Sequence, residues 1–159
     1  MISGRIGSGK STLGSALAGL SLVESGQIIL EGCRSRVFLM QFPEYQVTGP
    51  TVSREISSWG VSCGGPAFSS FDVKVSDRDP FSLSRGELKR LMLACVFAKD
   101  PDVLILDEPY ASLDVSAKEV LTGLIKNRRG ITIVFSHETE FAPNHALRWK
   151  IYGGGLYRE

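Results

Sequence analysis

A glycine-rich segment near the start of the chain has the composition of a phosphate-binding loop. Residues 4–11 read GRIGSGKS, which matches the pattern G-x-x-x-x-G-K-[ST] between a short apolar stretch and a segment with helical spacing. Glycines let the backbone approach phosphate oxygens, Lys10 would reach the β/γ oxygens and Ser11 would bind Mg²⁺. The alternative is a flexible turn, which the strand–loop–helix context disfavours. The predicted phosphate-binding residues are Gly4, Gly7, Ser8, Gly9, Lys10, Ser11 and Thr12.

Two adjacent carboxylates follow a continuous apolar run at residues 103–106. Such a run is typical of a strand that is buried on both faces of a sheet. If the strand before the phosphate loop is its neighbour, Asp107 would hold Mg²⁺ through water and Glu108 would orient or deprotonate the attacking water. The alternative is that both carboxylates only cap the turn before Pro109.

The segment LSRGE, residues 83–87, lies just upstream of that strand and resembles the signature motif of ABC ATPases. The resemblance implies that Ser84 and Gly86 contact the γ-phosphate of an ATP held by a second subunit. From the residues alone, Ser84 and Glu87 form a capping box at the start of a helix. Both interpretations can hold together. Arg85 replaces the family's usual glycine, and the sign of its effect stays open.

Three further segments resemble ABC ATPase motifs in family order: Gln41 the Q-loop, Ser112-Leu113-Asp114 the D-loop, and His137 the switch histidine. A lone histidine is more often structural, but the place of His137 after the apolar run 131–135 favours a functional role. The resemblance implies catalytic residues Lys10, Gln41, Glu108 and His137, metal ligands Ser11, Gln41 and Asp107, and nucleotide contacts from Ser84, Gly86 and Asp114. ATP and Mg²⁺ are the implied cofactors.

Residues 41–46, QFPEYQ, resemble the Q-loop region of energy-coupling-factor and cobalt-type importers. The resemblance implies an ATPase on the cytoplasmic face of the cell membrane, which pairs with a second ATP-binding subunit and drives solute transport through transmembrane subunits. Phe42 and Tyr45 would then receive a helix of such a subunit, unless they pack locally in the core. The alternatives are a non-transport ABC ATPase and a regulatory nucleotide-binding module.

The elements that must position these residues alternate between strand and helix. Apolar runs predict strands at residues 1–3, 27–30, 37–40, 103–106 and 131–135, and a terminal hairpin within 149–157. Helical spacing predicts helices over 13–17, 84–96 and 120–125, with Lys89 on the polar face of the second. We therefore expect an α/β fold of the P-loop NTPase type, with a mainly parallel sheet flanked by helices. ABC ATPases also carry an antiparallel β-subdomain before the phosphate loop. We expect this N-terminal subdomain to be missing or reduced in this chain.

The composition limits the number of domains and the classes of binding partner. With 159 residues and 43% hydrophobic content, the chain fits one ATP-binding domain, 1–159, in which residues 42–82 form the Q-loop and a reduced helical region. Lys and Arg total 18 against 17 acidic residues, so the net charge of +1 gives no basic field for nucleic acid. We expect the three cysteines to be small buried hydrophobic residues.

Overall fold

The computed structural model describes residues 1–159. Six strands form one sheet in the order β2-β3-β4-β1-β5-β6. All neighbouring strands are parallel except β5 and β6, which form an antiparallel pair. This confirms the predicted parallel sheet and the terminal hairpin. The strands are β1 (Ile2–Gly4), β2 (Arg36–Leu39), β3 (Val103–Asp107), β4 (Ile131–Phe135), β5 (Trp149–Tyr152) and β6 (Gly155–Arg158).

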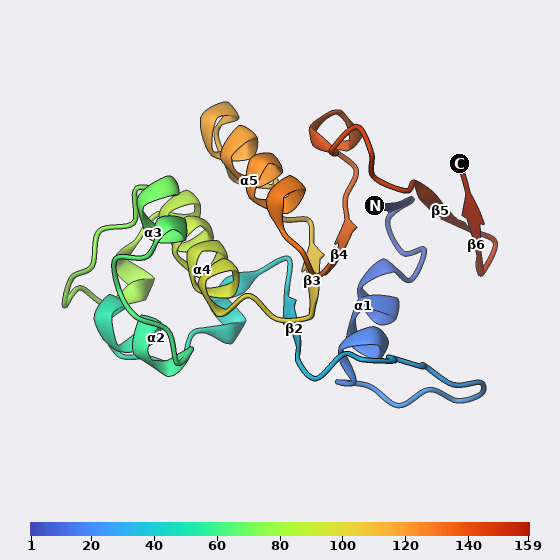
Figure 1. Ribbon diagram of the computed structural model, residues 1–159, viewed down its shortest axis with the longest axis horizontal. Coiled ribbons are helices and arrows are strands. Elements are labelled where there is room, and N and C mark those ends of the chain that lie inside the picture. The colour runs from blue at the N-terminus through green and yellow to red at the C-terminus, as the bar shows by residue number, and fades with distance from the viewer.

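Helices flank the sheet, and Figure 1 shows α2, α3 and α4 gathered at one end of the molecule, far from the β5–β6 hairpin. The α-helices are α1 (Lys10–Ala18), α2 (Val52–Ser58), α3 (Pro66–Ser70), α4 (Arg85–Lys99) and α5 (Val115–Asn127). Short 3-10 helices span Pro43–Gln46, Pro80–Ser82 and Thr139–Phe141. None of the helices combines the length and the apolar character that crossing a bilayer requires.

Strand β3, which lies between β2 and β4, is buried at every position. Leu104 and Leu106 belong to one apolar cluster that includes much of α4, whereas Val103 and Ile105 belong to a second cluster against which α1 packs. Alternate residues of a strand point to opposite faces, so both faces of β3 are covered. The burial of both faces explains why the sequence of this strand is a continuous apolar run.

Two predictions about local structure are wrong. Residues 27–30 form no strand, and the side chain of Ile29 is 65% exposed, because no other segment pairs with this stretch. Of the cysteines, only Cys95 is buried, and this burial raises the pKa of its thiol to about 12. Cys63 is exposed because it lies in the glycine-rich connection between α2 and α3.

Candidate functional site

A cavity of about 530 Å³ lies where the carboxyl ends of β1, β3 and β4 meet the start of α1. Its volume is within the usual range for a ligand site. A larger cavity of about 710 Å³, beside Trp59 and Arg128, contains none of the predicted site residues. The predicted residues that line the smaller cavity are Gly7, Gly9, Lys10, Ser11, Thr12, Gln41, Asp107, Glu108 and His137.

The glycine-rich loop has the backbone geometry of an anion cradle. Gly7 and Gly9 have φ angles of 78° and 94°, in the left-handed region that favours glycine. Helix α1 begins at Lys10, so the unpaired N–H groups of its first turn lie at the cavity. The ammonium of Lys10 donates to the carbonyl of Gly4 at 2.8 Å and contacts that of Arg5 at 3.3 Å. The loop therefore wraps around a lysine that faces the cavity.

Two residues of the predicted phosphate set do not line the cavity. Gly4 is buried below the loop, where an added Cβ would come within 2.7 Å of the Ser8 hydroxyl and 3.1 Å of the Ile151 carbonyl. The Ser8 hydroxyl is itself buried without a hydrogen-bond partner. Close packing thus explains the glycine at position 4, and both residues act on the shape of the loop.

Ser11 and Asp107 meet directly, although the strands that lead to them are not neighbours. Strand β4 lies between β1 and β3, so the condition under which the sequence placed Asp107 at the metal, that these two strands are neighbours, is not met. Helix α1 nevertheless brings the Ser11 hydroxyl to the carboxylate of Asp107, to which it donates at 2.6 Å. A hydroxyl and a carboxylate are oxygen ligands of the kind that Mg²⁺ takes beside waters and phosphates. This pair fits a magnesium ion, and Gln41 lines the same cavity.

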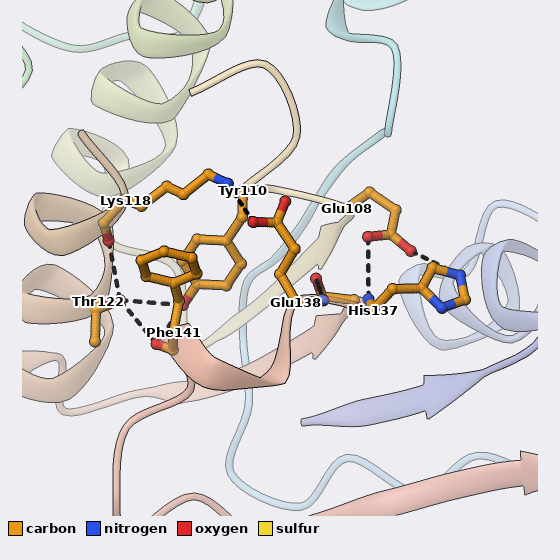
Figure 2. A network of polar contacts seen from close by, with 8 residues as sticks. Glu108, Tyr110, Lys118, Thr122, His137, Glu138 and Phe141 are labelled. Carbon is orange, nitrogen blue, oxygen red and sulfur yellow. Dashed lines mark hydrogen bonds and ion pairs between the residues drawn. The ribbon is translucent and has the colours of Figure 1, made fainter. Parts of the chain in front are cut away.

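Glu108, His137 and Lys10 converge on one side of the cavity, and Figure 2 shows the Glu108 carboxylate directed at His137. The backbone N–H of His137 donates to Oε2 of Glu108 at 3.3 Å, while Oε1 lies 3.4 Å from Nε2 of the imidazole. The same Nε2 lies 3.1 Å from the Lys10 ammonium. Glu108 also has a φ of 44°, a conformation that costs energy in a residue with a side chain and is frequent at active sites.

The segment after His137 is held by contacts that the sequence did not reveal. Glu138 forms an ion pair with Lys118 of α5, and that ammonium lies 4.9 Å from the centre of the Phe141 ring. Phe141 stacks on Tyr110, with ring centres 5.5 Å apart, and its carbonyl accepts hydrogen bonds from Tyr110 and Thr122 (Figure 2). These contacts join the segments that carry Glu108 and His137 to α5. The charged residues of α5 are Lys118, Glu119 and Lys126, and no pattern among them indicated these contacts.

Three predicted nucleotide contacts lie outside the cavity. Ser84 and Glu87 form the predicted capping box of α4, and the hydrogen bonds from Ser84 lower the pKa of the Glu87 carboxyl. Gly86 packs close to the Ser112 carbonyl, where a Cβ would lie at 3.0 Å. Asp114 caps α5 through the N–H of Ala117 at 2.8 Å and pairs with Arg90. Within one chain Ser84 and Asp114 stabilise helix ends, and Gly86 allows the close approach of the Ser112 carbonyl.

Phe42 and Tyr45 are 50% and 80% exposed, so they do not pack in the core. Their rings meet edge to face, with centres 6.3 Å apart, at the 3-10 helix that follows β2.

Lys89 is buried, although the sequence predicted that it would lie on the polar face of its helix. Its exposed fraction is 2%. Its helix is covered on nearly every side by apolar neighbours, as the uninterrupted apolar run 91–98 indicates.

The chain is similar to ATP-binding subunits of transporters. Residues 65–111 match the ABC transporter family. The energy-coupling factor transporter ATP-binding protein EcfA2 of Bacillus licheniformis is 33% identical over an alignment that covers 90% of this chain and 60% of that protein. EcfA2 of Streptococcus thermophilus is 36% identical, covering 82% and 57%. The chain thus spans about three fifths of the length of the curated relatives that it matches.

Solved structures show the same fold. CbiO1 of Clostridium perfringens, part of the ABC transporter complex CbiONQ, has a TM-score of 0.74 at 24% identity, covering 98% of this chain and 74% of that one. The dimeric ATP-binding cassette MJ0796 bound to ADP and Pi has a TM-score of 0.78 at 18% identity, covering 99% and 83%. These likenesses confirm the predicted mainly parallel α/β fold with flanking helices.

Proposed function

Because the chain belongs to the ABC transporter family of ATP-binding proteins, we propose that it binds Mg-ATP and hydrolyses it to power solute transport through transmembrane partners. The observation that carries this proposal is the convergence of four separate segments on one cavity. Its wall includes Gly7, residues 9–12, Gln41, the adjacent Asp107 and Glu108, and His137. They supply cations, an oxygen pair for a metal and a candidate base, which phosphoryl transfer requires together.

Each residue of the cavity has a task that follows from its geometry. The N–H groups at the start of α1 and the ammonium of Lys10 bind the phosphates. Ser11 and Asp107 hold the Mg²⁺ ion, which, when bound, neutralises charge on the phosphate oxygens. Glu108 accepts a proton from water as the water oxygen bonds to the γ-phosphorus and the bond to the ADP oxygen breaks. Gln41 assists in positioning that water and the metal.

The imidazole of His137 takes one of two states in this arrangement. Lys10 has only donors, so its contact requires an Nε2 without a proton, whereas the contact with Glu108 requires an Nε2 that carries one. When Lys10 turns to a phosphate, Nε2 becomes free to donate to Glu108 or to a phosphate oxygen. His137 then contributes a hydrogen bond to the reacting groups.

The proposed partners follow from what lies outside the cavity. Ser84, Gly86 and Asp114 would complete the ATP site of a second ATP-binding subunit, and the MJ0796 relative is a dimer. The exposed Phe42 and Tyr45 would receive a helix of a transmembrane subunit. The relatives named for the energy-coupling factor support that branch and a place on the cytoplasmic face of the membrane.

Co-purification of the full protein from native membranes, followed by an ATPase assay, tests this function. We expect a second ATP-binding subunit and transmembrane proteins to elute with it, and hydrolysis that rises in their presence. Recovery of an active ATPase without any membrane protein would point instead to the non-transport class of ABC ATPases. An assembly without ATP turnover would contradict the enzymatic part of the proposal.

A further inference from the structure

Lys89 is a buried cation without a carboxylate partner. It lies in the second turn of α4, is 2% exposed and takes part in no ion pair. The one hydrogen bond of its ammonium runs to the carbonyl of Gln41, 48 residues away in sequence, at 3.2 Å. This bond joins the helix of the signature segment to a residue on the wall of the nucleotide cavity.

Stability does not explain a lysine at this position. Burial lowers the pKa of Lys89 to about 8, although the carboxylates of Asp107, Glu44 and Glu108 act in the opposite direction. An incompletely compensated buried charge destabilises a fold, and an apolar side chain of similar length is often neutral or stabilising in its place. The neighbours of Lys89 along the helix, Leu88 and Met92, are themselves buried and apolar. A methionine would therefore suit the packing at least as well.

The bond from Lys89 has a counterpart one residue earlier in the chain. Just after β2, the N–H of Met40 donates to the side chain of Gln46 at 2.8 Å, and the amide of Gln46 donates to the carbonyl of Phe38 at 2.8 Å. Gln46 thus holds the chain up to Met40, and Lys89 holds the carbonyl of Gln41. The side chain of Gln41 is exposed at the cavity, so its orientation depends on how this backbone is fixed.

We propose that Lys89 is a positioning residue, which fixes the backbone of Gln41 to α4 so that the Gln41 side chain reaches the metal and the attacking water. This inference rests on the proposed function, because the task of Gln41 is part of it. Ser84 and Gly86 lie within about two turns of Lys89 on the same helix. The bond from Lys89 therefore joins the helix that carries Ser84 and Gly86 to the backbone of Gln41.

Three variants of the full protein test the proposal. Lys89→Met removes the donor and the charge, and Lys89→Arg keeps both. Lys99→Met is the matched control, since Lys99 lies on the same helix and also donates to a backbone carbonyl, that of Trp59 at 2.9 Å, but lies far from the cavity residues. The measurements are amide hydrogen exchange of residues 40–46 without nucleotide, thermal unfolding, and kcat and KM for ATP in the complex with co-purifying partners.

We expect Lys89→Met to keep or raise the unfolding temperature while exchange at residues 40–46 speeds up and kcat falls about fivefold to tenfold, with KM nearly unchanged. Lys89→Arg restores exchange and most of kcat, and Lys99→Met matches the wild type in all measurements. A Lys89→Met chain with wild-type exchange and kcat, or one that does not fold, would overturn the proposal. A wild-type complex without ATP turnover would refute the proposed function instead, while the exchange measurement would still judge the contact between Lys89 and Gln41.

Discussion

The hydroxyl of Ser11 has one hydrogen bond in the structure, to the carboxylate of Asp107, and this contact lies where we propose that the metal binds. Neither residue is identified by type alone, since serines and aspartates are common on any surface. The pair indicates a metal site because Ser11 follows the phosphate loop and Asp107 ends a buried strand. Both segments were recognisable in the sequence, whereas the direct contact between them was not.

Replacing Ser11 with alanine separates the metal from the phosphate contacts. We expect the affinity for Mg-ATP to fall about tenfold or more, because a ligand of a charged group is lost, while the affinity for ATP in excess chelator changes little. Titration calorimetry measures both. Ser15→Ala, in the same helix but outside the cavity, is the control. An equal loss with and without Mg²⁺ would remove Ser11 from the metal site.

At the scale of elements, the sequence predicted helices and strands best where the local signals agree. Strand β3 was recognisable because both of its faces are covered, and α4 because its capping box and apolar pattern agree. Residues 27–30 have the same apolar composition as a strand, yet pairing depends on a partner that local sequence does not specify. Helices α2 and α3 were missed among glycines and prolines, although Thr51 caps one and Pro66 begins the other.

In the site, too, residues that local sequence patterns position were predictable, whereas contacts between distant segments were not. The phosphate loop, the carboxylate pair and His137 lie at one cavity, as the sequence indicated, because each comes at or after the carboxyl end of a strand that meets it. Lys89 and the ion pair of Lys118 with Glu138 were missed, because their partners lie 48 and 20 residues away. Contacts across such distances depend on how helices pack on the sheet.

The ion pair between Lys118 and Glu138 gives a prediction at this scale. Because it joins α5 to the segment after His137, Glu138→Lys should lower kcat several-fold by placing two like charges together. Lys118→Glu should do the same, and the double charge swap should recover part of the loss. Steady-state ATPase kinetics of the four proteins measure this coupling. Strictly additive losses would show that the pair does not position His137.

At the scale of the whole molecule, the sheet order brings the ends of β3, β4 and β1 to one cavity and leaves the signature segment outside it. Ser84 is exposed at the start of α4. Figure 1 shows this helix beside α2 and α3 at one end of the molecule. A second ATP-binding subunit would bring its own signature segment to this cavity. Under the proposed function, the chain therefore contains two half-sites that a dimer would complete.

Dimer formation should accordingly depend on ATP and on Ser84. We expect the Glu108→Gln protein to form dimers with Mg-ATP in sedimentation experiments, and an added Ser84→Arg change to prevent them by placing a bulky side chain at the shared phosphate. The control is Ser69→Arg, at an exposed serine of α3, which should leave dimers intact. Dimers that persist with Ser84→Arg would contradict a shared site.

The most direct measurement is the rate of phosphate release at saturating Mg-ATP for the wild-type protein and Glu108→Gln, each with its co-purified partners. The amide keeps the shape of the side chain but removes the base, so binding by Lys10, Ser11 and Asp107 should change less than about twofold while release slows about a hundredfold or more. Near wild-type release by Glu108→Gln, or a wild-type protein that releases no phosphate, would contradict the account.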